Sequence, residues 1–163
     1  KIGDFGLSRK ISPKKKLTPQ MVTMWYRCPE LLLNETKYSV GVDIYSIALC
    51  IIELMSGTPL LKGVSEIHQL DLIKQHLGDE RYDMQQNHNS SERFQNQRVR
   101  NIFEIISKKY SNICKDEVNI MYELSDLLAR MLSWCPENRP SSLDALGHPY
   151  FSFVKNKKLS RTC

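Results

Sequence analysis

The sequence lacks any cysteine pattern that would support a zinc site or a disulfide framework. It has five cysteines, an odd number, and no two of them stand at C-x-x-C spacing. Structural zinc sites and small secreted domains show paired spacings of that kind. We therefore expect the protein to work in a reducing, intracellular compartment. The cysteines are Cys28, Cys50, Cys114, Cys135 and Cys163.

The sequence also lacks a long apolar run and a concentrated basic region. Its longest apolar stretch, at 44–52, is about half of the roughly 20 residues that a membrane-spanning helix needs. The net charge is only +5, and the clearest basic clusters are short lysine-rich runs at 14–16 and 155–158. Solvated loop and tail lysines explain such runs better than a nucleic-acid-binding face does. We expect neither a membrane nor a nucleic acid as a partner.

What the sequence does contain is helical periodicity. Between residues 42 and 55, apolar residues recur at steps of three and four, the period of an α-helix. Ser39 is expected to cap the start of this helix, and Gly57 to end it. The opposite face is apolar as well, and a helix that is apolar all round lies in the middle of a domain. We therefore expect the rest of the chain to cover this helix on every side.

The remaining pattern predicts a mainly α-helical chain with no convincing strand pair. A polar stretch at 79–100 is expected to form a long surface loop. Further helices are predicted just after Pro29, over 65–77, 102–110 and about 118–134, and from a capping box at Ser141 and Asp144 to near Gly147.

Two short motifs near the start carry the chemistry. Asp4-Phe5-Gly6 is weak evidence alone, because a three-residue match is common. Residues 23–30, Thr-Met-Trp-Tyr-Arg-Cys-Pro-Glu, follow about 20 residues later. This segment resembles the T-x-W-Y-R-A-P-E that closes the activation segment of cyclin-dependent and mitogen-activated protein kinases, with Cys28 in place of alanine. The two motifs at this separation form a highly specific combination.

The resemblance to protein kinases continues along the chain. Residues 38–48 are similar to the family's Y-S-x-x-x-D-x-W-S-x-G, 65–70 to its S-E-I-D-Q-L, and 127–151 to its closing helices. Tyr45, Ala48 and Cys135 depart from the usual tryptophan, glycine and aspartate. The resemblance implies the helical C-terminal lobe of the kinase fold, with the N-terminal lobe and the catalytic loop missing. It divides the chain into a partial kinase domain at 1–151, with the activation segment at 1–30 and the helical lobe at 31–151, and a tail at 152–163.

Roles for residues near the start follow from this resemblance. In kinases the aspartate of D-F-G, here Asp4, binds the magnesium that bridges the nucleotide phosphates. The packing of the phenylalanine, here Phe5, sets active and inactive states, and Gly6 completes the motif as a structural residue. Thr23 would contact the catalytic aspartate and line the site for the substrate serine or threonine.

The segment between the two motifs resembles that of the PITSLRE-type cyclin-dependent kinases. Ser12-Pro13 and Thr18-Pro19 carry this similarity. The resemblance implies that Thr18 is the activation-loop phosphorylation site. A phosphate adds about −1.5 to −2 charge and can order a loop against arginines, of which Arg27 would be one.

Three more residues are implied to hold the lobe together. Glu30 would pair with Arg139, which ties the activation segment to the closing helices. In the family, the aspartate at the position of Asp43 is buried and holds the catalytic loop by hydrogen bonds. A lone buried charge is costly, so we expect its partner to come from a segment outside this sequence.

Several parts of a working kinase are absent from this sequence. The seven glycines never form G-x-G-x-x-G, and none of the four histidines is followed by Arg-Asp. Asp4 would then be the sole metal ligand, and we expect no phosphate transfer by this chain alone. The leading interpretation is a fragment of a serine/threonine kinase whose intact parent uses ATP and Mg²⁺ on protein substrates, needs a cyclin, and works in the nucleus, the cytoplasm or both.

The alternative is a non-catalytic binding module that engages kinase partners through the helix after Gly63. The fragment interpretation predicts a large apolar patch along the 42–55 helix, which soluble monomers rarely show. A pseudokinase is disfavoured because Asp4, Glu30, Asp43 and Arg139 are all retained.

Overall fold

The described part of the chain is helical, as the sequence predicts. The computed structural model describes residues 3–8, 23–36, 38–78, 90–110 and 115–152. Within these ranges there are α-helices and short 3-10 helices, and no strand. The α-helices are α1 (Pro29–Leu32), α2 (Gly41–Ser56), α3 (Glu66–Leu77), α5 (Ser90–Ser107), α6 (Lys115–Met131) and α7 (Ser142–Leu146), and the 3-10 helices are η1 (Phe5–Leu7), η2 (Met24–Tyr26) and η3 (Pro136–Asn138).

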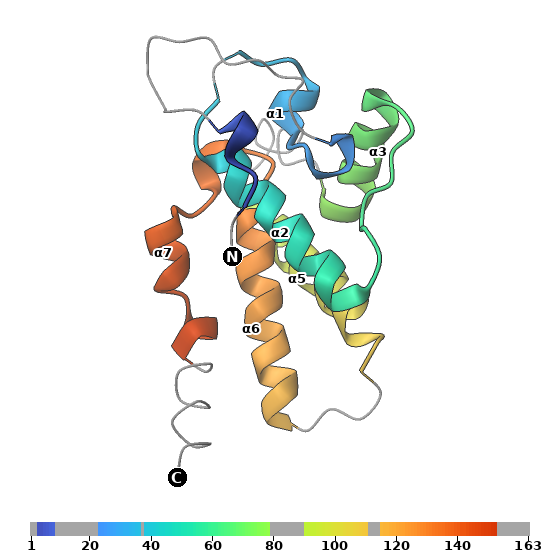
Figure 1. Ribbon diagram of the computed structural model, residues 1–163. Coiled ribbons are helices and arrows are strands. Elements are labelled where there is room, and N and C mark those ends of the chain that lie inside the picture. The colour runs from blue at the N-terminus through green and yellow to red at the C-terminus, as the bar shows by residue number, and fades with distance from the viewer. Residues whose placement is uncertain (1–2, 9–22, 37, 79–89, 111–114, 153–163) are drawn as a thin grey trace.

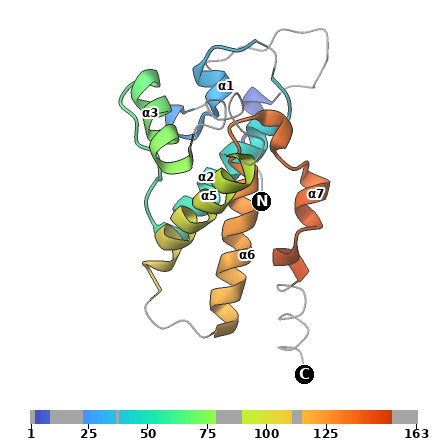
Figure 2. The same cartoon turned by 180° about the vertical axis from the view of Figure 1, so that it is seen from behind.

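Three helices form the centre of the fold. Figures 1 and 2, seen from opposite sides, show α2, α5 and α6 packed together, with α3 on one side and α7 on the other. α5 and α6 make the most extensive contact, and α2 packs on both of them. Each contributes fully buried side chains to one core, among them Tyr45, Ala48 and Ile52 of α2, Ile102 and Ile106 of α5, and Leu128 of α6. None of the described helices is long and apolar enough to cross a bilayer.

The ends of the predicted helices are largely where the sequence places them. α2 ends at Gly57, whose φ of 85° is the left-handed conformation that glycine adopts without strain. Its start differs by one residue: Val40 is the N-cap, while the Ser39 hydroxyl accepts a hydrogen bond from the Gly41 N–H at 3.2 Å. The predicted capping box is present, with Ser141 and Asp144 each accepting a backbone N–H of the other. This bonding lowers the pKa of Asp144 below its usual value.

One face of α2 is exposed, so the prediction that this helix is covered on every side is wrong. Ile47 is 44% exposed and Leu54 is 78% exposed. Together with Asp43 and Cys50 they recur at steps of three and four, which places them along one side of the helix. Burial of such an aliphatic side chain is worth about 1.5–3 kcal/mol, which this face does not gain. The described chain thus leaves uncovered a side of α2 that carries Ile47 and Leu54 together with the charged Asp43.

The helix α5 corrects the prediction of a long loop at 79–100 followed by a short helix. The described chain is continuous helix from Ser90 to Ser107, and residues 79–89 lie outside the described ranges. The sequence pattern misses this helix because a charged residue, Arg98, occupies a core position. Arg98 is only 2% exposed. Its polar partners, rather than apolar character, make that position compatible with the core.

Arg98 is buried because carbonyl groups from three helices surround it. Its guanidinium donates to the Ala129 carbonyl at 3.1 Å, the Leu77 carbonyl at 3.4 Å and the Gln95 Oε1 at 3.2 Å. These acceptors belong to α6, to the end of α3 and to α5 itself. Arg98 therefore joins three helices at one point.

We predict that Arg98→Ala lowers the free energy of unfolding by about 2–4 kcal/mol, because it leaves a cavity and buried carbonyls without donors. Chemical denaturation of the intact protein measures this loss. The matched control is Arg100→Ala, two residues along the same helix and exposed, which should change stability by less than about 0.5 kcal/mol. Equal effects of the two substitutions would show that the Arg98 contacts do not stabilise the fold.

Candidate functional site

The D-F-G motif lies in a short turn with an unusual backbone. Asp4 caps η1 with φ 55° and ψ 73°, in the left-handed region that non-glycine residues seldom occupy. Its Oδ1 accepts a hydrogen bond from the Gly6 N–H at 3.4 Å. The turn is exposed, and the Phe5 ring is 67% exposed rather than packed. Strained residues of this kind cluster at functional sites, where the surrounding structure fixes them.

Asp4 fits the role of one magnesium ligand. Its carboxylate is exposed and keeps free lone pairs beyond the bond to Gly6. Magnesium in phosphate-transfer sites is held by one or two carboxylates, with waters and substrate phosphates completing the shell. Among the described residues there is no cluster of three or more potential metal-ligating side chains. Within that part of the chain, Asp4 would thus act together with the phosphates and not within an all-protein cage.

Residues 23–27 are anchored to the start of α3 through Trp25 and Gln69. The Trp25 indole Nε1 donates to the Gly63 carbonyl at 3.0 Å, and Gln69 Nε2 donates to the Trp25 carbonyl at 3.1 Å. Gln69 Oε1 accepts from the Gly63 N–H at 2.8 Å. A side chain on Gly63 would come within 2.8 Å of the Gln69 Cα, so only glycine fits there. The Trp25 ring is nonetheless 37% exposed, so it is only partly packed.

A second anchor joins the same segment to α2. The Tyr26 hydroxyl donates to Glu53 Oε2 at 2.6 Å, and the Ser46 hydroxyl donates to the Tyr26 carbonyl at 2.9 Å. The hydrogen bond to Glu53 raises the pKa of Tyr26 to about 12. Sequence reasoning missed both Glu53 and Gln69 as functional supports. For Glu53 the available signal was a charged residue among the apolar positions of a predicted helix, whereas Gln69 lies in a helix with many polar residues and carries no such signal.

Arg27 pairs with a carboxylate in the structure. Its Nη1 lies 3.1 Å from Glu66 Oε1, at the first turn of α3, and its side chain is 14% exposed. A carboxylate at that position also suits the helix dipole. Thr18, whose phosphate Arg27 was expected to bind, lies outside the described residues. Thr23 precedes η2 and is exposed, with no side-chain capping hydrogen bond.

The end of the segment is held by a buried ion pair between Glu30 and Arg139. Arg139 Nη1 lies 2.6 Å from Glu30 Oε1, and Nη2 lies 2.8 Å from Oε2, a bidentate arrangement. The side chains are 3% and 0% exposed, respectively. The structure therefore contains the pair that the resemblance implies, across 109 positions of sequence.

Arg139 has every donor satisfied. Its Nε donates to the Ser133 carbonyl at 2.8 Å, Nη1 to the Gly41 carbonyl at 3.1 Å and Nη2 to the Trp134 carbonyl at 3.1 Å. With the two bonds to Glu30, all five N–H groups of the guanidinium are used. The guanidinium carbon also lies 4.9 Å from the centre of the Tyr45 ring. Burial opposes the charge, but the bonds to Glu30 outweigh it and raise the pKa of Arg139.

Two further residues of the matched motifs lie in opposite environments: Cys28 is buried and Asp43 is exposed. Cys28 is fully buried beside the pair, and burial raises its pKa to about 12, so the thiol stays protonated and unreactive at neutral pH. Asp43 is exposed on the open face of α2, so the burial that the resemblance implied for it is not found. No described segment reaches over it to hold the carboxylate.

Comparison with known proteins decides the family. The model of the protein kinase domain matches residues 1–151. The chain belongs to the protein kinase family. It is 38% identical over 152 residues to a probable cyclin-dependent kinase 10 and likewise to a cyclin-dependent kinase 11, both of Dictyostelium discoideum. It is 33% identical over 153 residues to mitogen-activated protein kinase 6 of Arabidopsis thaliana.

These matches cover most of this chain but less than half of each relative. They include 93% of this chain but only 40%, 41% and 37% of those three kinases, respectively. This kinase chain thus spans about two fifths of the length of the curated relatives it matches. The helical fold, without a strand in the described residues, agrees with the helical lobe of a kinase.

We predict that Arg139→Ala destabilises the kinase chain by about 3–5 kcal/mol, because it leaves the Glu30 carboxylate buried without a partner. Glu30→Gln should also be strongly destabilising, because it leaves the Arg139 charge buried without a counterion and turns an amide donor towards a guanidinium donor. Denaturant unfolding of the intact protein measures both.

Arg130→Ala is the control, because Arg130 is 54% exposed and its pair with Asp126 lies near the surface. It should cost less than about 1 kcal/mol. A loss for Arg139→Ala as small as this would mean that the buried pair does not stabilise the lobe.

Proposed function

We propose that this chain is part of a serine/threonine kinase of the cyclin-dependent type. The intact protein would transfer the γ-phosphate of ATP to serine or threonine in protein substrates. The observation that carries the proposal is the buried Glu30–Arg139 pair, which fixes the end of residues 23–30 on the helical lobe of a chain that also has an exposed D-F-G turn. The similarity to kinases named as cyclin-dependent supports the subgroup.

In this proposal each part of the segment has one task. Asp4 would hold one magnesium ion, which when bound would supply charge stabilisation for phosphate transfer. Thr23, exposed at the start of η2, lines the site for the accepting hydroxyl. Phosphoryl transfer depends mainly on positioning and charge stabilisation, so a rigidly held segment is the contribution this lobe can make.

Regulation would act on the segment between the two motifs. We propose that Thr18 is phosphorylated and that Arg27 joins the arginines receiving its phosphate, which would then compete with Glu66 for the same guanidinium. A cyclin is the proposed partner of the intact kinase, and the nucleus or the cytoplasm its proposed location. This chain alone is proposed to be inactive, because it contains no H-R-D and no glycine-rich phosphate loop.

A second candidate function is a non-catalytic binding module. Val64 and Ile67, at the start of α3, are 86% and 76% exposed, and exposed apolar side chains of this kind favour contact with another protein. A module of this kind would bind partners through α3 without transferring phosphate. Phosphate transfer by the intact protein separates the two functions, since only the kinase proposal requires it.

We predict that Asp4→Asn in the intact protein lowers phosphate transfer from ATP about a thousandfold or more, because a metal ligand contributes several kcal/mol of charge stabilisation. Transfer of labelled phosphate to a peptide containing Ser-Pro measures this loss. The control is Asp71→Asn on the exposed face of α3, which should leave the rate unchanged. Melting temperatures of both variants should match that of the unsubstituted protein.

Wild-type activity in Asp4→Asn would refute the role of Asp4 in metal binding. Absence of phosphate transfer by the unsubstituted intact protein, with partner binding that requires Val64 and Ile67, would instead support the binding module.

A further inference from the structure

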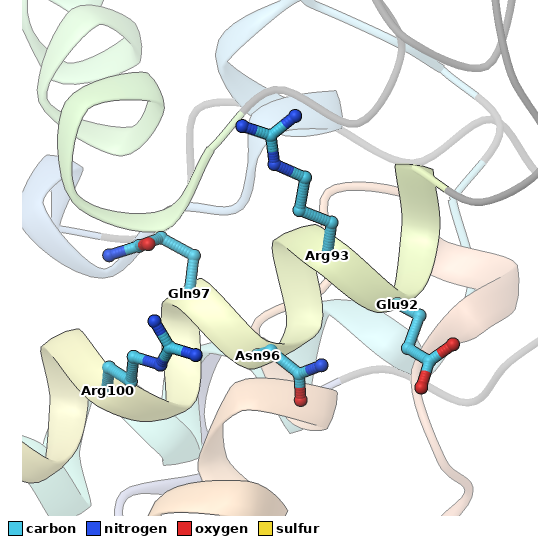
Figure 3. Close-up of a pocket in the computed structure, with 5 residues that line it drawn as sticks. All are labelled: Glu92, Arg93, Asn96, Gln97 and Arg100. Carbon is cyan, nitrogen blue, oxygen red and sulfur yellow. The ribbon is translucent and has the colours of Figure 1, made fainter.

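The exposed side of α5 carries a polar hollow that the kinase proposal does not use. The hollow has a volume of about 570 Å³ and is lined by Glu92, Arg93, Asn96, Gln97 and Arg100 (Figure 3). We call these five residues the α5 hollow. Every one of them is exposed or nearly so, while Arg98 and Val99 on the other side of the same helix are buried. One helix thus has a core face and a separate hydrophilic face.

The two arginines of the α5 hollow occupy backbone positions on one side of the helix at a fixed spacing. Arg93 and Arg100 are seven residues apart, or two helical turns, which corresponds to about 10.5 Å along the axis. The amides of Asn96 and Gln97 stand between them, three and four residues from either end. Figure 3 shows all of these side chains projecting from the single helix α5. Along the helix axis, the α5 hollow therefore presents a guanidinium group, two amides and a second guanidinium group.

Both guanidinium groups lack a partner among the residues that the structure describes. Within the described ranges, neither Arg93 nor Arg100 makes a hydrogen bond or an ion pair. The other described arginines differ: Arg98 is bonded to carbonyls, and the remaining three are paired with carboxylates, namely Arg27 with Glu66, Arg130 with Asp126 and Arg139 with Glu30. Gln97 uses its Nε2 on Asn101, which leaves its own carbonyl oxygen as an acceptor. The α5 hollow thus offers unused donors at both ends and amide groups in the middle.

This arrangement matches an extended acidic peptide. A guanidinium fork binds a carboxylate through two parallel hydrogen bonds. A polyproline II segment has three residues per turn and a rise of about 3.1 Å, so side chains three residues apart lie on one face about 9.3 Å apart. Two carboxylates at that spacing would meet Arg93 and Arg100, while the amides of Asn96 and Gln97 would face the peptide backbone between them.

We propose that the α5 hollow binds a partner protein through an extended segment with two carboxylates three residues apart. Charge favours carboxylates, because two of them balance two arginines one to one. Two phosphate groups would bring about twice that charge next to Glu92, the acidic end of the α5 hollow. A nucleic acid is a poorer match, because Glu92 opposes a continuous row of phosphates and no aromatic side chain of the α5 hollow could stack with a base.

The test uses the intact protein and a fluorescein-labelled peptide with the core Glu-Pro-Pro-Glu between Gly-Ser flanks. Fluorescence anisotropy should detect saturable binding that weakens as salt is raised. Arg93→Gln and Arg100→Gln should each weaken binding by about tenfold or more, the effect of losing one charge-assisted contact. Arg93→Lys should weaken it severalfold, because lysine keeps the charge but loses the fork.

Three controls make the result specific. Lys108→Gln removes one exposed positive charge just beyond α5 and should leave binding unchanged. A Gln-Pro-Pro-Gln peptide should fail to bind, and a peptide with the two glutamates adjacent should bind more weakly. Melting temperatures should be unaltered in all variants, since neither arginine has a described internal partner.

Three outcomes would overturn the proposal. The first is no binding of the Glu-Pro-Pro-Glu peptide at millimolar concentration. The second is equal binding by the Arg93→Gln, Arg100→Gln and Lys108→Gln variants. The third is Arg93- and Arg100-dependent binding of a phosphoserine peptide or a short oligonucleotide in preference to the carboxylate peptide, which would assign the α5 hollow to a different ligand. None of these outcomes bears on phosphate transfer, so the kinase proposal is tested separately.

Discussion

The buried pair between Glu30 and Arg139 is the constraint on which the rest of the structure depends. Removing a carboxylate and a guanidinium from water costs several kcal/mol each, and only complete hydrogen bonding offsets that cost. Arg139 meets this condition because four carbonyl or carboxylate groups from three segments converge on it. The geometry exists only when α1, the start of α2 and the turn after α6 are all in place. The pair therefore specifies one arrangement of these segments more than it adds net stability.

That arrangement fixes residues 23–30 at several points. The pair holds the end of the segment, the bond from Tyr26 to Glu53 holds its middle against α2, and the exchange between Trp25 and Gln69 holds it against α3. The hydrogen bonds to α2 and α3 are part-buried, and each costs less to break than the fully buried ion pair. A segment built in this way keeps its base fixed while its outer part adjusts to a substrate, which is what a positioning element for phosphate transfer requires.

Much of the fold could be predicted from the sequence, but not the burial of polar side chains. The extent of α2, its end at Gly57 and the capping box at Ser141 depend on local rules that a sequence displays directly. The end of α5 was predicted, but its first part was missed because Arg98 occupies a core position and breaks the apolar pattern. The helix that contains Gln69 was predicted, but the full burial of this side chain was not. The partners of Arg98 and Gln69 are backbone carbonyls and amides of distant segments, which no local pattern identifies. The Glu30–Arg139 pair could be anticipated only from resemblance.

The same principle separates the structural arginines of this chain from those available to a ligand. Arg98 and Arg139 are buried and bonded to the backbone, so their charge serves the fold. Arg93 and Arg100 lie on the same helix as Arg98, yet their guanidinium groups make no hydrogen bond or ion pair among the described residues. A charged side chain gains nothing from a hollow that only solvent fills, since water solvates it equally well on a convex surface. A pair of unused forks at a fixed spacing gains affinity only when a complementary anion is present, because their spacing is already set by the helix. The rigid packing of α5 on α6, which depends on Arg98, is what would give the exposed face its specificity.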